Sequence, residues 1–379
     1  MKIRLNEPSI SRLEFKYVND VLKKGWLSSG GEHTKKFEKK LCKFLKIKNG
    51  FAVQSGTAAL HTALKGLGVK QNDAVVVPNY TCLSNLSSVV QCGAKPIIVE
   101  VENETLGLDF MQLKKAIRIY KPKVVQLVHV YGFVARDTVK IKKLCNKKKI
   151  KLLEDNSEGL GAVLNGKKTG TFGDITINSV RSEKMIGVGE GGFVATNDKK
   201  LYDKCNNYAS RNTKFRTSKD PYWKKYYADG EGCNYKLPHL LGAFGRGQIE
   251  RFKKILENKR NVGKNYRKLF KSKKYTLLGK IIKGSKPVYW LNGIYLHKSN
   301  FQTTIKIGNE LIKKGIEVRS GFWPLNKQSG FKFKYVGSTK VSQDIFNKAI
   351  ILPSTYNLSL KKIEFIKITL NKILKKYKI

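Results

Sequence analysis

The stretch VVQLVHVYGFVARDTVKIKKLCNKKKIKLLEDNS, residues 124–157, decides the fold. It begins and ends in short apolar runs that are typical of buried strands, and the segment 138–149 between them has apolar residues at helical spacing. Two neighbouring strands joined through a helix are usually parallel, because the crossover returns the chain to the same end of the sheet. The stretch therefore predicts one β–α–β unit of an α/β domain.

The same alternation extends on both sides of this unit, from about residue 50 to residue 200. The apolar runs and helical patterns that continue it are residues 50–56, 57–68, 73–79, 95–102 and 113–120. Two further strands are expected at residues 172–180 and 191–198, on either side of a glycine-rich turn. We therefore expect a mainly parallel sheet that is covered by helices.

A second, smaller domain is expected after a long helical pattern that begins near Pro238 and continues to about Phe270. The residues after it hold short strands and two helical segments, which favour an α+β domain. We therefore predict a large domain at residues 1–250, with N-terminal residues able to pack on the smaller domain, and a small domain at residues 251–379. The aromatic, charged stretch at residues 216–235 is expected to be an ordered loop.

The chain of 379 residues has a formal net charge of +47, which invites a nucleic-acid interpretation. The lysines, however, lie between apolar residues at helical spacing, as in residues 358–378, and this is typical of solvated helix faces. There is no zinc finger, RNP-like aromatic motif or basic tail. We therefore expect no nucleic-acid partner, although the same field would attract an anionic substrate such as a nucleotide diphosphate.

The six cysteines are scattered without a C-x-x-C pair, and the five histidines show no ligand spacing, so neither a metal site nor a disulfide framework is expected. No run is long and apolar enough to cross a bilayer, and the first residues, MKIRLNEPSISRLEF, lack the apolar core of a signal peptide. The expected location is therefore the cytoplasm, with no membrane partner.

The stretch SEKMIGVGEGG, residues 182–192, places Lys184 directly before a glycine-rich turn. The glycines at positions 187, 189 and 192 match the G-x-G-x-x-G pattern by letter. That fingerprint requires a strand before it and a helix after it, whereas a β-rich run follows here. These residues therefore do not predict a dinucleotide site, and the position of Lys184 needs another explanation.

Two other elements supply an answer. Ser55, Gly56 and Thr57 follow an apolar strand at the start of a helix, where free N–H groups and the helix dipole favour a phosphate. Asp155 ends an apolar strand, at the edge where open α/β sheets bind ligands. Each could be a simple helix cap. Together with Lys184 they are the parts of a pyridoxal phosphate site: a phosphate cradle, a carboxylate for the pyridinium and a lysine for the Schiff base.

The chain also resembles the sugar aminotransferases of the DegT/DnrJ/StrS type over nearly its whole length. The matching motifs include GWLSSGGEHTKKFEKKL (25–41), SGTAALHTAL (55–64), EDNSEGLGA (154–162), KMIGVGEGGFVATND (184–198), GCNYKLPHLLGAFGRGQIER (232–251) and EVRSGFWPL (317–325). GEGG and GFWPL look most like the perosamine-synthase branch. The resemblance implies an aspartate aminotransferase-like fold, PLP fold type I, with pyridoxal 5'-phosphate as cofactor and a homodimer with shared active sites.

The resemblance also implies roles for individual residues. Lys184 would be the catalytic lysine that attaches the cofactor, Asp155 would pair with the pyridine nitrogen, and Glu158 would lie near the phenolic oxygen. The residues implied to bind the phosphate are Gly56, Thr57 and Ser179, joined by Asn234 from the neighbouring subunit. The residues implied to border the substrate pocket are Trp26, Ser28, Arg319, Phe322 and Trp323.

Two positions depart from the family pattern. Cys82 stands where relatives usually have an aromatic residue that stacks on the cofactor ring, and Tyr80 is a candidate substitute. The segment NSVRSEK replaces a usually aromatic run and brings Arg181 and Glu183 near the site. These two residues either contact substrate or pair with each other at the surface.

The resemblance further implies transfer of the amino group of L-glutamate to the C4 keto carbon of a nucleotide-linked 4-keto-6-deoxyhexose, for glycan biosynthesis. Amination at C3, and a non-catalytic regulator or nucleic-acid binder on the same fold, are the alternatives. Dehydratases of the family have histidine in place of the lysine, so Lys184 argues against that reaction. The sequence leaves open whether the nucleotide is GDP, dTDP or UDP.

Overall fold

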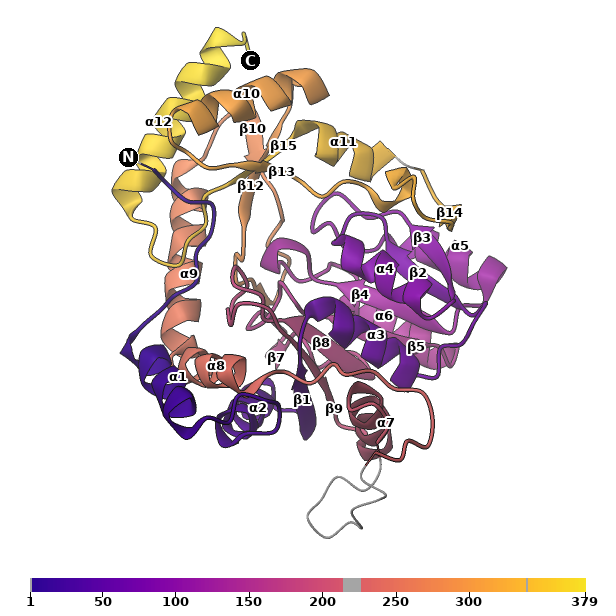
Figure 1. Ribbon diagram of the computed structural model, residues 1–379. Coiled ribbons are helices and arrows are strands. Elements are labelled where there is room, and N and C mark those ends of the chain that lie inside the picture. The colour runs from indigo at the N-terminus through magenta and orange to yellow at the C-terminus, as the bar shows by residue number, and fades with distance from the viewer. Residues whose placement is uncertain (1, 214–225, 339) are drawn as a thin grey trace.

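The computed structural model describes residues 2–213, 226–338 and 340–379 (Figure 1). Part of the predicted loop at 216–235 therefore lies outside the described residues. The helices are α1 (Arg12–Lys24), α2 (Glu32–Leu45), α3 (Gly56–Gly66), α4 (Leu83–Gln91), α5 (Phe110–Tyr120), α6 (Thr138–Lys147), α7 (Lys199–Ala209), α8 (His239–Glu250), α9 (Phe252–Leu269), α10 (Phe301–Lys313), α11 (Lys340–Lys348) and α12 (Leu360–Lys376).

The central element is an eight-stranded sheet in the order β1-β9-β8-β5-β4-β2-β3-β14. Its strands are β1 (Asn49–Val53), β2 (Ala74–Pro78), β3 (Lys95–Val99), β4 (Val124–Val128), β5 (Lys151–Asp155), β8 (Ile175–Ser179), β9 (Gly192–Thr196) and β14 (Lys334–Val336). The ladders from β8 to β14 are parallel, and β9 is antiparallel to both of its neighbours. The predicted α/β class and mainly parallel sheet are confirmed.

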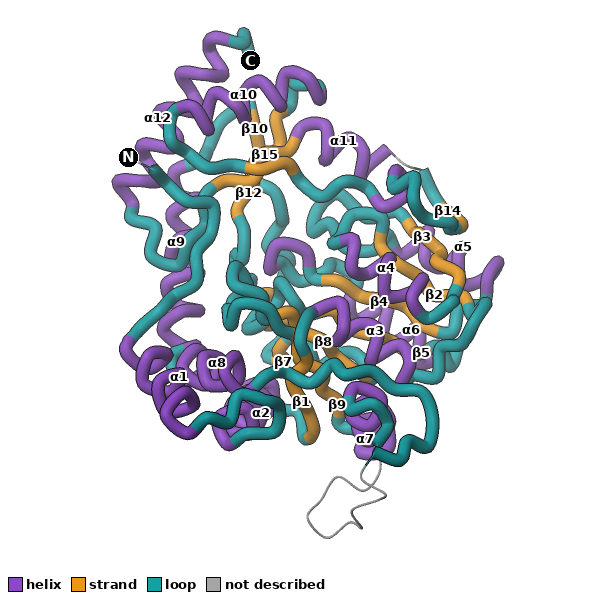
Figure 2. Tube along the Cα trace, viewed as in Figure 1, coloured by secondary structure: helices purple, strands orange, loops and turns teal. Residues whose placement is uncertain are grey.

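Helices cover both faces of this sheet, as Figure 2 shows. Val75 and Val77 of β2 pack in the same apolar cluster as residues of α3 and α4, whereas Val76 between them packs with residues of α5 and α6. Successive side chains of a strand point to opposite faces, so these clusters lie on the two sides of the sheet. This explains why the strands read as continuous apolar runs.

Both edges of the large sheet are paired by chain that arrives from a distant part of the sequence. At one edge β14 is parallel to β3, so residues 334–336 extend the large sheet although they follow the small-domain strands. At the other edge, Gln54 N donates to Tyr235 O at 2.7 Å and Leu237 N donates to Ala52 O at 3.2 Å, alongside β1. A three-stranded sheet, β11 (Ser285–Lys286), β6 (Val163–Leu164) and β7 (Lys167–Lys168), lies apart from it.

The C-terminal region contains a four-stranded antiparallel sheet in the order β10-β12-β15-β13. Its strands are β10 (Tyr275–Leu277), β12 (Asn292–Leu296), β15 (Ala349–Leu352) and β13 (Arg319–Ser320). Residues of α9, α10 and α12 share its apolar cluster, and Ile3 pairs with Ile316 in a parallel bridge. The N-terminal segment thus lies against this region, while the division at residue 250 stays a prediction.

The helical pattern from Pro238 to Phe270 forms two consecutive helices rather than one. Pro238 is the N-cap of α8, and Arg251, with φ −102° and ψ 2°, separates α8 from α9. Figure 1 shows α9 running from the level of α8 up to the C-terminal sheet. It therefore connects the two parts of the molecule as expected.

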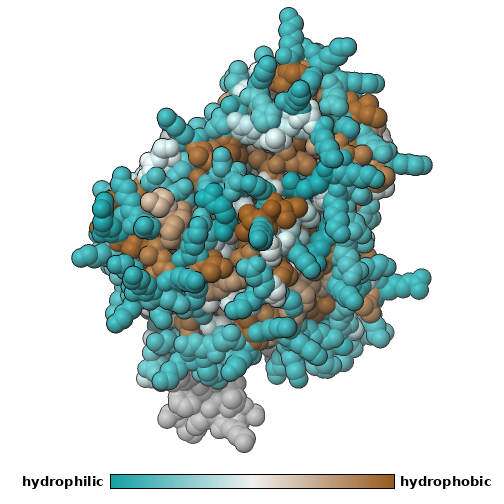
Figure 3. All heavy atoms as spheres, turned by 180° about the vertical axis from the view of Figure 1, so that it is seen from behind, coloured by the Kyte–Doolittle hydropathy of each residue, from teal (hydrophilic) through white to brown (hydrophobic). Residues whose placement is uncertain are grey.

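The lysine-rich helices present hydrophilic residues to solvent, and Figure 3 shows such residues over most of one face. In α9, for example, Phe252, Ile255 and Leu256 are buried, whereas Lys253 and Lys254 are exposed. The charge is thus accommodated on solvated surfaces. Across the described residues, we find no helix with the length and apolar character that a membrane crossing demands.

Candidate active site

A pocket lies where the parallel strands β5 and β8 end and the helices α3 and α4 begin, the location that open α/β sheets use for ligands. Six of the predicted cofactor residues line it: Gly56, Cys82, Asp155, Glu158, Ser179 and Lys184. Thr57 lies beside them, since its Oγ1 donates to Ser84 Oγ of the pocket wall at 2.9 Å. The structure therefore brings together residues from five separate segments of the sequence.

The first turn of α3 forms one wall of the pocket. Ser55 caps the helix, since its Oγ accepts from Ala58 N at 3.0 Å, while the N–H groups of Gly56 and Thr57 have no acceptor within the helix. A side chain at Gly56 would meet Ser179 Cβ at 3.0 Å, so glycine leaves room between α3 and the end of β8. Free N–H groups, the helix dipole and the Ser179 hydroxyl make a suitable phosphate cradle.

Asp155 is the last residue of β5 and is buried, with 4 % of its surface exposed. Its Oδ2 accepts from Asn85 Nδ2 at 2.9 Å, and its Oδ1 accepts from Ser157 N at 3.0 Å. Gln126 fixes Asn85 in turn, because its Oε1 accepts from the same Asn85 amide at 2.8 Å. The carboxylate is therefore oriented at the pocket wall, ready to accept from a protonated ring nitrogen.

Lys184 reaches the pocket from the turn after β8, and only 11 % of its side chain is exposed. Its Nζ donates to Glu158 Oε1 at 3.1 Å and lies 3.5 Å from the centre of the Trp290 ring. The other oxygen of Glu158 accepts from Tyr131 N at 2.7 Å. Burial raises the pKa of Glu158, and the nearby Lys184 ammonium opposes that rise.

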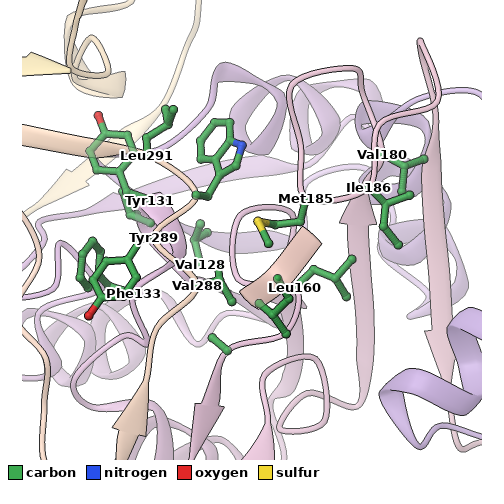
Figure 4. Close-up of a cluster of buried hydrophobic side chains, with 14 of the residues drawn as sticks. Val128, Tyr131, Phe133, Leu160, Val180, Met185, Ile186, Val288, Tyr289 and Leu291 are labelled. Carbon is green, nitrogen blue, oxygen red and sulfur yellow. The ribbon is translucent and has the colours of Figure 1, made fainter. Parts of the chain in front are cut away.

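The glycine-rich turn after Lys184 serves close packing. A Cβ at Gly187 would lie 2.3 Å from Ser182 O, and one at Gly192 would lie 2.2 Å from Ser55 O, so neither position tolerates a side chain. Met185 and Ile186 are buried and anchor the turn in the hydrophobic core (Figure 4). The strand β9 follows instead of a helix, which confirms the rejection of a dinucleotide fingerprint.

Tyr80, a candidate substitute for the missing stacking residue, does not line the pocket, which leaves the other alternative, a less tightly held cofactor ring. The Tyr80 side chain is 0 % exposed, because the ring packs against Tyr131 and Phe322 and its hydroxyl lies 3.0 Å from that of Tyr131. Cys82 is exposed at the N-cap of α4 and lines the pocket itself. The face of the pocket at position 82 is thus bordered by a thiol and not by a ring.

Arg181 and Glu183 pair at the surface, one of the two alternatives left open by the sequence. Arg181 Nε donates to Glu190 Oε1 at 2.9 Å, and its Nη1 lies 3.4 Å from Glu183 Oε1. The side chains of Arg181 and Glu190 are both mostly exposed. Neither Arg181 nor Glu183 lines the Lys184 pocket.

The predicted substrate residues lie farther out. Trp26 and Ser28 belong to the loop between α1 and α2, which His239 holds: its backbone N donates to Leu27 O at 2.9 Å, and its Nδ1 lies 2.8 Å from Trp26 O. Trp26 is 58 % exposed, and Asn234 is also exposed. None of these residues lines the Lys184 pocket within one chain.

The three predicted residues of the C-terminal region differ in their surroundings. The Arg319 guanidinium lies 5.7 Å from the Trp290 ring, on the side of the site. Phe322 stacks on Tyr131 with ring centres 5.4 Å apart, whereas Trp323 is half exposed and packs on Phe346 at 4.5 Å. Arg319 and Lys184 therefore both lie near the Trp290 ring.

Sequence reasoning missed Asn85 and Trp290. Asn85 lies in the first turns of α4, three residues after Cys82, and its polar side chain close to a predicted pocket residue is the one signal that could have pointed to it. No local signal marks Trp290, because it precedes β12 in the C-terminal region and meets Lys184 only through the tertiary fold.

The donor set fits pyridoxal phosphate. Gly56, Thr57 and Ser179 suit its phosphate, Asp155 suits its ring nitrogen, and Lys184 can attach its aldehyde. The absence of a side chain at Gly56 keeps the phosphate end open, which is an observation of shape independent of the charges.

The comparisons with known proteins agree with this geometry. The model of the DegT/DnrJ/EryC1/StrS aminotransferase family matches residues 8–370. GDP-perosamine synthase of Vibrio cholerae is 35 % identical over 328 residues, covering 85 % of each chain, and that of Escherichia coli O157:H7 is 32 % identical over 367 residues, covering 96 % of each. The PLP form of the putative sugar aminotransferase Spr1654 from Streptococcus pneumoniae has the same fold, with a TM-score of 0.90 at 22 % identity over 99 % of both chains. The chain therefore belongs to the DegT/DnrJ/EryC1/StrS aminotransferase family, whose members are pyridoxal phosphate-dependent enzymes.

Proposed function

We propose that this aminotransferase moves the amino group of L-glutamate to the C4 keto carbon of a nucleotide-linked 4-keto-6-deoxyhexose. The observation that carries the proposal is the convergence of Lys184, Asp155 and the Gly56–Ser179 cradle on one pocket. The two relatives named GDP-perosamine synthase support a GDP-linked sugar as the first candidate. The product would be a 4-amino-4,6-dideoxyhexose of the perosamine type for glycan biosynthesis.

When bound, pyridoxal phosphate supplies an electron sink and carries the amino group between the two substrates. Lys184 would move protons at the substrate carbons: its amine would take one from the α-carbon of glutamate and later deliver one to C4 of the sugar. Asp155 would accept a hydrogen bond from the ring nitrogen of the bound cofactor and favour its protonated form. Asn85 and Ser157 hold that carboxylate in place through the hydrogen bonds at 2.9 and 3.0 Å.

Glu158, which contacts the amine of Lys184, is also part of the proposed site. Burial raises the pKa of Glu158, while the Lys184 ammonium opposes that rise. Its Oε1 accepts from Lys184 Nζ at 3.1 Å. In the proposed site, its carboxyl group would lie near both the lysine amine and the phenolic oxygen of the bound cofactor.

The proposal includes a homodimer. Asn234, Trp26 and Ser28 are exposed and do not line the Lys184 pocket of their own chain, and in a dimer they would complete the partner's site. Arg319 would face the sugar nucleotide from the C-terminal region, where a guanidinium suits a diphosphate. A fully formed substrate pocket would thus require two chains.

The test is the absorption spectrum of the purified protein between 300 and 500 nm with pyridoxal phosphate, before and after L-glutamate. We expect an absorption band at the long-wavelength end of this range that glutamate removes and that a GDP-linked 4-keto-6-deoxyhexose restores. NMR of the product should then show the transferred nitrogen at C4. The Lys114→Ala variant, at an exposed lysine, is the matched control for Lys184→Ala and should behave like the parent. Restoration by a 3-keto sugar alone would overturn the C4 assignment, and failure to bind the cofactor would overturn the proposed function.

A further inference from the structure

The peptide carbonyl of Glu183, directly before Lys184, accepts two side-chain hydrogen bonds. One comes from Trp290 Nε1 at 2.6 Å, and the other comes from Asn6 Nδ2. Asn6 belongs to the N-terminal segment and Trp290 to the C-terminal region, so two remote parts of the chain hold the same peptide group. The backbone that carries Lys184 is therefore fixed from outside its own turn.

Lys259 of α9 ties these two donors together. Its Nζ donates to Asn6 Oδ1 at 2.9 Å and to Trp290 O at 2.9 Å, and it also donates to Ser354 O. The side chain is buried, with 3 % exposed, and three acceptors match the three N–H bonds of an ammonium group. Asn6, Trp290 and Lys259 thus form a closed hydrogen-bonded network with the Glu183 carbonyl.

The ring of Trp290 completes the arrangement at the lysine itself. Lys184 Nζ lies 3.5 Å from the ring centre and 3.1 Å from Glu158 Oε1, so the amine sits between an aromatic face and a carboxylate. Both neighbours attract a cation, and the attraction of a ring face is strongest where water is excluded. Trp290 is 1 % exposed.

We propose that Trp290 is a positioning residue for the Lys184 amine, and that Asn6 and Lys259 hold Trp290 in that position. The indole acts twice: its N–H fixes the backbone next to Lys184, and its face receives the amine whenever that amine is not bonded to the cofactor. The importance of this position for catalysis rests on the proposed role of Lys184.

The test uses the full-length protein freed of cofactor, so that it does not depend on the reaction. The protein is treated briefly with acetic anhydride between pH 6 and pH 9, and acetylation of Lys184 relative to the exposed Lys114 is measured by peptide mass spectrometry. In Trp290→Leu the amine loses the ring face that holds it, so acetylation of Lys184 at pH 7.5 should rise about five-fold.

Two further variants separate the functions of the indole. Trp290→Phe keeps an aromatic face and loses the N–H donor, so its Lys184 profile should lie between those of the parent and Trp290→Leu. Asn6→Ala keeps the ring and removes one bond to the Glu183 carbonyl, so it should raise acetylation about two-fold. If Trp290→Leu does not fold, these two variants carry the test.

Trp323→Leu is the matched control, because Trp323 packs on Phe346 and does not contact Lys184. It should leave the ratio of Lys184 to Lys114 acetylation unchanged. An unchanged ratio in both Trp290 variants, or an equal change in Trp323→Leu, would overturn the proposal. If the acetylation results hold while pyridoxal phosphate fails to bind, the positioning role stands and the proposed function falls.

Discussion

The residues around Lys184 differ sharply from those predicted to meet the substrate. The inner group, Asp155, Glu158 and Lys184, is largely buried, and each side chain has hydrogen-bond partners within the chain. The outer group, of which Trp26 and Ser28 are examples, is exposed and shares no pocket with the lysine. The residues proposed to carry the chemistry are thus brought together within one chain, while these residues proposed to meet the substrate remain exposed on it.

The largest effect is expected from Lys184→Ala, which removes the amine of the inner group. Loss of the group that moves protons should reduce kcat at least about 10⁴-fold, measured with glutamate and a 4-keto sugar nucleotide. Added small amines should restore part of the rate, since the pocket around them is otherwise intact. A variant that keeps more than a tenth of the activity would show that the inner group is not the catalytic one.

Asp155→Asn tests the inner group without removing the lysine. The amide keeps the shape but loses the negative charge that would hold the ring nitrogen protonated, so kcat should fall about 10²-fold while the cofactor still binds. Absorbance and steady-state rates measure both quantities. Asp203→Asn, at an exposed aspartate paired with Lys199, is the control and should leave the rate unchanged.

Lys259 allows a pH test of the buried network that supports the inner group. Burial lowers its pKa to about 7, against an ordinary value of 10.5 in the unfolded chain. Between these values the unfolded chain binds a proton that the folded chain has lost, so raising the pH favours folding. Relative to Lys259→Met, the free energy of unfolding of the parent should rise by up to about 1.4 kcal/mol per pH unit from pH 7 to pH 10.

Urea denaturation of both proteins at several pH values measures this difference. Below pH 7 Lys259 holds its proton in the folded and in the unfolded chain. The difference in free energy of unfolding between the parent and Lys259→Met should therefore not change with pH there. A Lys114→Met variant, at an exposed lysine, should show the pH dependence of the parent. Parallel curves for the parent and Lys259→Met would mean that Lys259 keeps its ordinary pKa.

Trp26→Ala tests the outer group. Because Trp26 is exposed and does not line the Lys184 pocket, the reaction with glutamate should keep its rate, while KM for the sugar nucleotide should rise about five-fold. Stopped-flow absorbance measures the rate of the reaction with glutamate, and steady-state kinetics measure KM for the sugar nucleotide. Equal damage to both steps would contradict the separation of the two groups.

The smallest effect is expected from Cys82→Phe at the border between the groups. A ring at this position of the pocket wall would stack on the cofactor, so pyridoxal phosphate should bind about three-fold more tightly. Equilibrium dialysis measures the change. Weaker binding would indicate that the space beside Cys82 is already filled when the cofactor is bound.

The inner group was largely predictable from the sequence because its residues follow strand and helix signals. Asp155 ends an apolar run, Gly56 and Thr57 start a helix, and Lys184 precedes conspicuous glycines. Sheet geometry then brings strand ends to one edge without further information. The same reasoning gave the mainly parallel sheet and the strands on either side of the Lys184 turn.

The neighbours of the inner group could not be predicted in this way. Trp290, Asn6 and Lys259 meet Lys184 through contacts between distant segments, and none of them has a local pattern that points to the site. The direction of the Tyr80 ring was unpredictable for a related reason: the residue is close in sequence to Cys82 of the pocket, but tertiary packing places its ring against Tyr131 and Phe322. Local signals predict where a chain passes, while packing decides which way a side chain faces.

The pairing of β14 with β3 has a consequence for the solubility of shortened chains. A parallel sheet that ends in an open strand offers unpaired backbone groups to any other extended chain and so promotes aggregation. Here residues 334–336 occupy one such edge, and the chain at residues 235–237 lies along the other. A fragment that stops before residue 334 would expose the hydrophobic strand β3 and should aggregate, even though every residue of the Lys184 pocket would still be present.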